Sequence, residues 1–303
     1  MAKLSSDHVF YAFEPGLEPA ITIKQGEELT LETMDCFGNQ LKTADDSLDA
    51  LDWDRINPAT GPVFIEGVKA GDIVRIKLLK VEPTGHCTMA CIPGEGAIKA
   101  IDETETVILE NTGDKVVLST SRGDIKIDTL PMIGVIGVAP QEGSVATGTP
   151  GAHGGNMDCT MIGQGATLYF RAGVDGALFG CGDLHAVMGD GEVSVCGAET
   201  PGIVTIVADV VEAGDLPTPF VEDEQLVAAI ASASTIDQAT HDAIDAMFAF
   251  LTKVVGLDTN ETANLMSLVG FLKYCQVVDP EVTVRFEFPQ QVLKELGFKG
   301  IGK

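Results

Sequence analysis

The sequence has little positive charge. It contains 19 lysines and arginines against 45 aspartates and glutamates, which gives a formal net charge of −26 at pH 7. A surface with this balance repels phosphate backbones and anionic lipid headgroups. We therefore expect no nucleic-acid partner and no membrane attachment. An acidic exterior is compatible with a neutral or cationic small molecule.

Long apolar runs, nucleotide motifs and closely paired cysteines are also missing. Charged residues or glycines interrupt every hydrophobic stretch, and the N-terminal segment MAKLSSDHVF lacks the apolar core of a signal peptide. No P-loop, no strand followed by G-x-G-x-x-G and no C-x-x-C pair occurs. We expect a cytoplasmic protein whose seven cysteines stay reduced. Cys159 and Cys181 lie near the glycine-rich centre of the chain, but no activating base pattern accompanies them, so we expect both to pack rather than react.

Short segments with alternating apolar residues predict a mainly β fold. Such segments occur at 20–24, 73–81, 106–110, 115–119 and 202–211, with turn signals between them. Their regular spacing is typical of β-sandwich or barrel lobes. We divide the chain into an N-terminal β-rich lobe at 1–130, a central β-rich catalytic lobe at 131–212 and an α+β C-terminal region at 213–303.

The C-terminal region changes character. Apolar residues follow helical spacing from Ile236 to Val255, and Asp258 begins a capping-box-like start for a second helix through Tyr274. Residues 282–288 alternate as a strand, and 289–296 predict a short terminal helix. We interpret this region as structural or as part of a dimer interface.

The stretch from Pro131 to Thr200 carries most of the candidate chemistry. Glycines that permit sharp turns and close approach to a ligand separate imidazole and carboxylate side chains. These are His153, Asp158, Asp183, His185, Asp190, Glu192 and Glu199. Asp183 and His185 are two residues apart, so on a strand they share a face, as two ligands of one metal must. Ordinary surface carboxylates on a solvated strand edge are the alternative.

Two features precede this stretch. Asp35 ends an alternating segment and either reaches a neighbouring site or forms a turn. The acidic residues between 41 and 56 lack EF-hand spacing, so a solvated loop is favoured over a calcium site. Trp53, the only tryptophan, falls in this loop, and we expect it to close over a small pocket.

Several phrases of the sequence resemble the acetamidase/formamidase family. They are NPATGPVFIEGVKAGD at 57–72, GTPGAHGGNMD at 148–158 and GDLHAVMGDGE at 182–192, and TMDCFGNQ at 33–40 resembles the N-terminal motif of the family. Their order also fits, and together they cover most of the chain through about Thr200. The resemblance implies an amidohydrolase that cleaves short aliphatic amides, such as formamide and acetamide, to carboxylate and ammonia.

An amide hydrolase must activate water, polarise the carbonyl and protonate the leaving nitrogen. With this chemistry implied, we expect a divalent metal, with zinc favoured by the mixed nitrogen and oxygen donors and iron or manganese as alternatives. The expected ligands are His153, Asp183 and His185, with Asp35 and Asp158 as further candidates. Glu199 is the first choice for the general base and acid, and Glu192 the second.

The backbone amides around Gly154, Gly155 and Asn156 are candidates to hold the developing oxyanion. The expected partners are a small neutral amide and a second copy of the chain in a homodimer. A different class remains open, namely a non-catalytic β-rich protein that holds structural calcium through oxygen ligands alone. A metal hydrolase of a larger amide or a urea-like compound is the other alternative.

Overall fold

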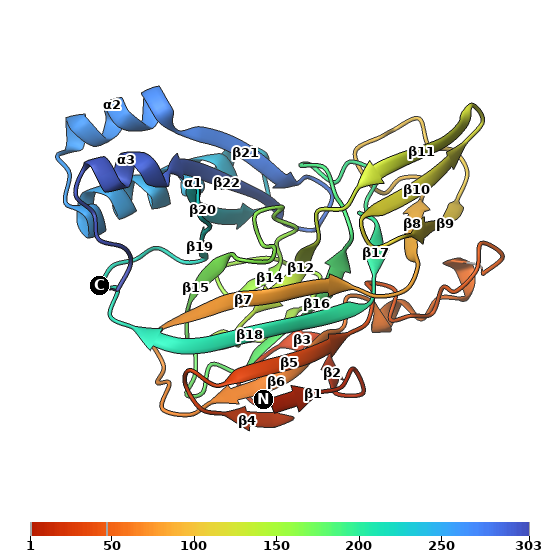
Figure 1. Cartoon of the computed structure of the whole chain (residues 1–303), viewed down its shortest axis with the longest axis horizontal. Helices are drawn as coiled ribbons and strands as arrows, with labels where there is room; N and C mark the ends of the chain where they lie inside the picture. The colour runs from red at the N-terminus through yellow and green to blue at the C-terminus, as the bar shows by residue number, and fades with distance from the viewer. Residues whose placement is uncertain (1, 47, 303) are drawn as a thin grey trace.

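The structure is a computed structural model that describes residues 2–46 and 48–302. Strands dominate it, and helices gather near the C-terminus (Figure 1). The strands are β1 (Ala2–Leu4), β2 (Val9–Phe10), β3 (Ala12–Phe13), β4 (Ile21–Ile23), β5 (Glu28–Thr33), β6 (Ala59–Ile65), β7 (Ile73–Pro83), β8 (Cys87–Cys91), β9 (Glu105–Asn111), β10 (Lys115–Thr120), β11 (Gly123–Asp128), β12 (Met132–Gly137), β13 (Val145–Ala146), β14 (Gly154–Asn156), β15 (Thr167–Arg171), β16 (Phe179–His185), β17 (Glu199–Thr200), β18 (Gly202–Val211), β19 (Phe220–Glu222), β20 (Leu226–Ala233), β21 (Phe271–Gln276) and β22 (Val282–Pro289). The helices are α1 (Ile236–Ala249), α2 (Thr259–Val269) and α3 (Gln290–Glu295), with 3₁₀ turns at Leu48–Ala50 and Trp53–Arg55 and a π-helical segment at Phe250–Val255.

A nine-stranded sheet runs through the whole chain in the order β1-β5-β18-β7-β15-β19-β20-β22-β21. Its pairs are antiparallel except for β1 with β5. The long strands β7 and β18 cross the middle of the molecule side by side (Figure 1). The division into three regions at residues 130 and 212 stays a prediction; in the structure, strands from all three regions share this sheet.

An eleven-stranded sheet forms the second layer. Its main order is β11-β10-β9-β8-β17-β16-β12-β14, and β6 joins β16 and carries β2 and β4. Strands β13 and β3 form a separate pair. The hairpin arm of β9, β10 and β11 projects from one end (Figure 1). This sheet delivers the polar residues of the candidate site, because β14, β16 and β17 all belong to it.

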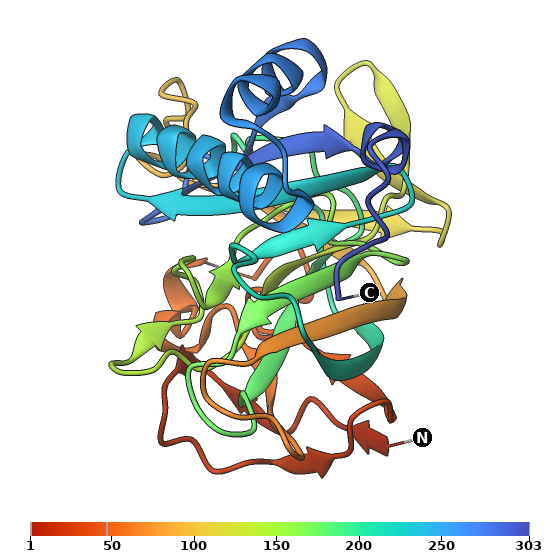
Figure 2. The same ribbon diagram turned by 90° about the vertical axis from the view of Figure 1, so that its left-hand side faces the viewer.

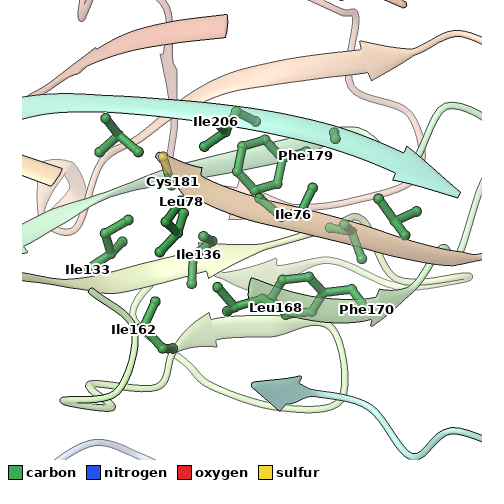
Figure 3. Close-up of a cluster of buried hydrophobic side chains, with 14 of the residues drawn as sticks. Ile76, Leu78, Ile133, Ile136, Ile162, Leu168, Phe170, Phe179, Cys181 and Ile206 are labelled. Carbon is green, nitrogen blue, oxygen red and sulfur yellow. The ribbon is translucent and has the colours of Figure 1, made fainter. Parts of the chain in front are cut away.

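The main hydrophobic core lies between the two sheets. Ile76, Leu168 and Ile206 from the nine-stranded sheet face Ile136 and Phe179 from the other, and all five are fully buried (Figure 3). Burying a side chain of this size contributes roughly 1.5–3 kcal/mol. The alternating pattern that predicted β strands therefore reflects two inner faces of a sandwich, and the mainly β fold class is confirmed.

A second core joins the helices to the C-terminal end of the nine-stranded sheet. Ala243 and Met247 of α1 are buried against β20 and β22 with Phe286. Figure 2 shows the helices outside these strands, at the end of the molecule opposite the N-terminal strands. None of the helices in the described residues is long and apolar enough to cross a membrane.

One predicted helix is too long. Asp258 does cap α2 by accepting a hydrogen bond from the Asn260 amide, as expected, but the helix ends at Val269. From Phe271 the chain is strand β21, which pairs with β22. The predicted continuation through Tyr274 is therefore wrong. Gly270 interrupts the helix, and pairing with β22 satisfies the backbone of the following residues instead.

Candidate active site

Strand β16 carries two of the predicted ligands on one face. Its pairing with β12 jumps from Leu184 to Gly182, and Asp183 between them adopts a φ of 56°. This left-handed conformation is uncommon outside glycine. Nε2 of His185 lies 3.5 Å from Oδ1 of Asp183. The two side chains placed on one strand face by their spacing do meet, and their roles as ligands stay predictions.

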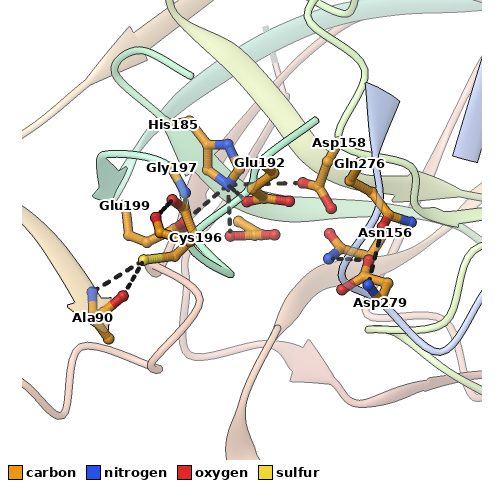
Figure 4. Close-up of polar contacts among 12 residues, drawn as sticks. Ala90, Asn156, Asp158, His185, Glu192, Cys196, Gly197, Glu199, Gln276 and Asp279 are labelled. Carbon is orange, nitrogen blue, oxygen red and sulfur yellow. Dashed lines mark hydrogen bonds and ion pairs between the residues drawn. The ribbon is translucent and has the colours of Figure 1, made fainter. Parts of the chain in front are cut away.

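Four carboxylates surround the imidazole of His185 (Figure 4). Its Nε2 lies 3.1 Å from Oε1 of Glu199, 3.5 Å from Oδ1 of Asp183, 3.8 Å from Oδ1 of Asp158 and 3.9 Å from Oε1 of Glu192. All five side chains are buried. The structure thus gathers in one place residues that are separated by up to about forty positions in the sequence. We call these five residues the acidic cluster.

Different elements deliver these carboxylates. Glu199 on β17 pairs directly across from His185 on β16, and Oε1 of Glu199 accepts a hydrogen bond of 2.8 Å from the Gly197 amide. Asp158 follows β14 with a φ of 44°, and Glu192 lies in a turn with a φ of 47°. The strand pairing explains the position of Glu199, whereas left-handed backbone aims the other two.

The pKa values in the cluster are shifted because four carboxyl groups are buried around one imidazole. Burial alone would lower the pKa of His185, but Glu199 and Asp183 hold it well above its ordinary range. Burial raises the pKa values of Asp158, Glu192 and Glu199, and neighbouring carboxylates raise them further. Asp183 differs, since its contact with His185 outweighs burial and lowers the pKa of this carboxyl.

The acidic cluster fits a divalent cation. Both oxygens of Asp158, Oδ1 of Asp183 and Oε2 of Glu199 are buried without a hydrogen-bond partner among the described residues. Buried carboxylates are normally paired with a cation or coordinate a metal. Donor atoms of Asp158, His185 and Glu192 all lie within 4.8 Å of one another, as do those of a second set formed by Cys36, Asp183 and Glu199.

The C-terminal region contributes a residue that the sequence did not reveal. Asp279, in the turn between β21 and β22, accepts a hydrogen bond of 2.9 Å at Oδ2 from Nδ2 of Asn156 (Figure 4). Burial and the charge of Glu192 raise the pKa of Asp279. No sequence motif marks Asp279, because it is over a hundred positions from Asn156 and becomes a neighbour only through folding. Cys36 was missed as well, although it directly follows Asp35.

Asp35 and His153 occupy different surroundings. Asp35 is buried beside the cluster, and its Oδ1 accepts a hydrogen bond of 2.7 Å from the Asn39 amide. Burial raises the pKa of Asp35 to about 6. His153 instead packs edge-on against Phe13, with ring centroids 5.2 Å apart, and lines a separate cavity with Arg171. His153 belongs to neither of the two potential metal-ligand groups.

Of the three residues predicted to hold the oxyanion, Gly154, Gly155 and Asn156, only Asn156 lines the cavity above the cluster. The Gly154 amide donates to the Gly151 carbonyl, and Gly155 pairs with Ile136 within the sheet. Asn156 is the member of this trio that lines the cavity above the cluster, and its Oδ1 has no hydrogen-bond partner among the described residues. The amide side chain of Asn156 is therefore better placed to meet a ligand than the two glycine amides.

Cys159 and Cys181 are fully buried. Burial raises the pKa of Cys181 to about 12, so this thiol is protonated at neutral pH. For Cys159, contacts with Cys275 and Arg285 lower the pKa in spite of burial. Neither cysteine lines the cavity above the cluster, whereas Cys36 and Cys196 do.

A cavity of about 400 Å³ opens above the acidic cluster. Its floor contains Asp183, Glu192 and Glu199, so the cluster is accessible to a ligand. Trp53 lies in its wall, as expected from the sequence. The remaining lining residues are Cys36, Phe37, Ile56, Asn57, Ala90, Ile92, Glu95, Asn156, Val195, Cys196, Val278, Asp279 and Pro280.

Comparison with known proteins identifies relatives of this arrangement. The structure is similar to the crystal structure of a predicted acetamidase/formamidase from Thermoanaerobacter tengcongensis, with 42% identity, a TM-score of 0.94 and 99% of each chain covered. An acetamidase from Bacillus halodurans shows 36% identity and a TM-score of 0.94 over 97% of this chain and 99% of its own. The formamidase of Methylophilus methylotrophus is 23% identical over 266 residues. That match covers 67% of this chain and 64% of the longer relative.

The family model agrees with these similarities. The Acetamidase/Formamidase family matches residues 2–147 and 141–249, which together take in β1 to β20 and α1. The matched part includes every member of the acidic cluster. The resemblance found in the sequence motifs is thereby confirmed, and the chain belongs to the acetamidase/formamidase family.

Proposed function

We propose that the protein is an amide hydrolase acting on the C–N bond of short aliphatic amides such as formamide and acetamide. In this reaction the oxygen of water bonds to the carbonyl carbon, the C–N bond breaks and the nitrogen leaves as ammonia with a proton from water. Membership in the acetamidase/formamidase family supports this class of reaction.

The observation that carries the proposal is the position of the acidic cluster at the floor of an accessible cavity. Three of its carboxylates, Asp183, Glu192 and Glu199, line the cavity, and His185 lies directly behind them. Perturbed ionisable groups that converge in a concave site are typical of catalytic centres. A purely structural network would instead satisfy its buried oxygens, several of which lack a partner here.

We assign Asp158, Asp183 and His185 as the residues that would hold a divalent cation. Zinc is favoured because the donors mix imidazole nitrogen with carboxylate oxygen, with iron or manganese as alternatives. Such a cation, when bound, lowers the pKa of water and polarises a carbonyl oxygen. The unpartnered oxygens of Asp158 and Asp183 support this assignment.

The remaining residues would handle protons and orient the substrate. Glu199 keeps Oε1 fixed by the Gly197 amide, which leaves Oε2 free to accept a proton from water and to pass it to the departing nitrogen. Glu192 is the second candidate for this role. Asn156 lines the same cavity, and its Nδ2 can donate a hydrogen bond to a carbonyl oxygen once it leaves Asp279.

The calcium-binding alternative is less well supported. It requires a set of oxygen ligands alone, with histidines in a structural role. Nε2 of His185 lies among the carboxylates, within 4 Å of four of them. Nitrogen at the centre of the donor set favours a transition metal over calcium.

Two variants test the assignment of ligand and base. His185→Ala should lower both metal content and ammonia release, because it removes a donor at the centre of the cluster. Glu199→Gln keeps the shape of the side chain but cannot accept a proton. It should retain the metal and lower turnover of formamide by roughly a hundredfold or more. Metal content by mass spectrometry and ammonia release from formamide and acetamide distinguish the two effects.

Glu95→Gln provides the matched control. Glu95 lines the same cavity but is exposed and lies outside the acidic cluster, so both metal content and turnover should persist. Loss of metal in Glu199→Gln would make Glu199 a ligand and Glu192 the better base. Full activity in protein shown to be free of metal would exclude the metal assignment, and inactivity of the metal-loaded protein on every amide would favour a binding role.

A further inference from the structure

The cavity above the acidic cluster is much larger than formamide or acetamide. Its volume is about 400 Å³. A water molecule occupies about 30 Å³ of the liquid, so an amide of three or four heavy atoms needs only on the order of 100 Å³. Cavities of roughly 300–1,000 Å³ hold ligands of many more atoms. Most of the volume therefore lies beyond the space that a short amide would fill.

Apolar side chains line the part of the cavity away from the floor. Phe37, Trp53 and Ile56 come from the loop after β5, Ile92 follows β8, and Val278 precedes Asp279. Trp53 is 50% exposed. An apolar group of a ligand that covered Trp53 and Ile56 would remove this surface from water.

The loop that contributes Phe37, Trp53 and Ile56 to this wall is ordered by its own packing and hydrogen bonds. Phe37 packs in a small core with Leu41, Leu48 and Leu51. The side chain of Gln40 joins both ends of the loop, since its Nε2 donates to the Phe37 carbonyl at 2.9 Å and its Oε1 accepts from the Asp52 amide at 3.0 Å. The apolar wall is thus held in place by packing and by hydrogen bonds.

The charges of the cavity restrict the ligand further. Among the described residues, those that line it include acidic side chains but no lysine, arginine or histidine. An anionic acyl group against the wall would therefore have no basic side chain to pair with and would lie near carboxylates. A second cavity of about 420 Å³ adjoins the first across Trp53, Ile56, Asn57, Asp279 and Pro280. Trp53 and Ile56 therefore contribute to the walls of both cavities.

We propose that the preferred substrate is an uncharged primary amide with a bulky apolar acyl group, of the size of a phenylacetyl group. Its carboxamide would lie at Glu199 and Asn156, and its apolar group would lie against Trp53 and Ile56. The reaction is the hydrolysis already described, in which water adds to the carbonyl carbon and ammonia leaves. This proposal rests on the proposed amide hydrolysis and places the preferred substrate above formamide and acetamide in size.

Steady-state kinetics on the metal-loaded protein test the preference. We expect kcat/KM for phenylacetamide to exceed that for acetamide at least tenfold, because only the larger amide buries apolar surface against the wall. Trp53→Ala should remove most of this advantage, mainly through KM for phenylacetamide. Trp53→Phe should restore it. Val193→Ala changes an exposed apolar residue outside this cavity and should alter neither substrate.

Trp53 also allows a measurement that is independent of turnover. It is the only tryptophan in the chain, so intrinsic tryptophan fluorescence reports on this wall alone. In the Glu199→Gln variant, phenylacetamide should shift the emission with saturation, whereas acetamide should not do so at the same concentrations. Ile56→Ala should weaken the phenylacetamide response at least fivefold.

The outcomes separate this inference from the proposed function. Hydrolysis of acetamide with equal or slower hydrolysis of phenylacetamide, and no fluorescence response, would overturn the substrate class and leave amide hydrolysis standing. A fluorescence response without hydrolysis of any amide would support the apolar site and contradict the proposed reaction. Unchanged selectivity in a folded Trp53→Ala variant would also overturn the inference.

Discussion

Backbone conformation at single residues shapes the acidic cluster. Asp158, Asp183 and Glu192 have φ values of 44°, 56° and 47°. These values lie in the left-handed region, which residues other than glycine rarely adopt. Conformations of this kind cost about 1–3 kcal/mol each and persist where the surroundings impose them. Gly134 of β12 lies beneath the cluster, where an added Cβ would collide with the carboxylates of Asp158 and Asp183. Only glycine fits at position 134, because the two carboxylates pack directly against its backbone.

The placement of His153 leads to a prediction about acid stability. Burial lowers the pKa of His153 from its ordinary value of 6.5 to about 4. A base whose pKa is lowered by folding stabilises the native state above pH 6.5, and this contribution is lost as the pH falls toward 4. One pKa unit is worth about 1.4 kcal/mol, so the lowering corresponds to about 3 kcal/mol.

The unfolding free energy of the wild type should therefore fall when the pH is lowered from 7 to 4, as His153 takes up a proton on unfolding. In His153→Leu this fall should be smaller by about 3 kcal/mol. Nε2 of His153 has no hydrogen-bond partner among the described residues, so leucine should be tolerated. Denaturant titrations of chelator-treated protein measure the difference without a contribution from metal release. His241→Leu, at an exposed position on α1, should follow the wild type. Loss of metal in untreated His153→Leu would instead support the predicted ligand role of His153.

At the scale of elements, β22 and the turn that holds Glu192 are tied together by Arg285. This guanidinium is buried, and it donates two hydrogen bonds to Asp190, at 2.8 and 2.7 Å, and one of 2.8 Å to Glu287. Asp190 also accepts from Thr160 at 2.8 Å, close to Asp158. The C-terminal region therefore supports the acidic cluster from behind as well as contributing Asp279.

Removing this tie should destabilise the protein. Arg285→Met leaves Asp190 and Glu287 without their main partner, and we expect a loss of about 3 kcal/mol in unfolding free energy together with reduced turnover. Lys273→Met is the control, because Lys273 meets Glu287 at 3.2 Å but its side chain is 44% exposed. Its effect should stay below about 1 kcal/mol. Equal effects of the two substitutions in denaturant titrations would contradict the assigned role of Arg285.

The elements also show how far the sequence could predict this site. Alternation brought Asp183 and His185 to one strand face, and glycine-rich segments indicated Asp158, Glu192 and Glu199. Asp279 could not be found, because the C-terminal region carries no motif and its turn meets Asn156 only in the folded chain. The helix predicted from Asp258 through Tyr274 was too long for the same reason. Its last residues form β21, because pairing with the distant strand β22 overrides the local helical pattern.

At the scale of the whole molecule, an edge strand stands out against a formal net charge of −26. Strand β21 ends the nine-stranded sheet. Phe271, Leu272 and Tyr274 on it are 57%, 40% and 44% exposed, and Leu268 of α2 beside it is 79% exposed. Lys273 on the same strand pairs with Glu287, so this edge adds no net charge. Two copies of an acidic protein would meet here with little repulsion.

The predicted homodimer is most simply formed by antiparallel pairing of β21 with β21 of a second copy. A twofold axis near the middle of β21 would bring the exposed rows of the two copies together and cover them. We expect light scattering to give the mass of a dimer for the wild type and of a monomer for Phe271→Asp, which places two like charges near the axis. Leu130→Asp, at a position 62% exposed after β11, should remain dimeric. A monomeric wild type would refute the dimer, and a dimeric Phe271→Asp variant would place its interface on another face.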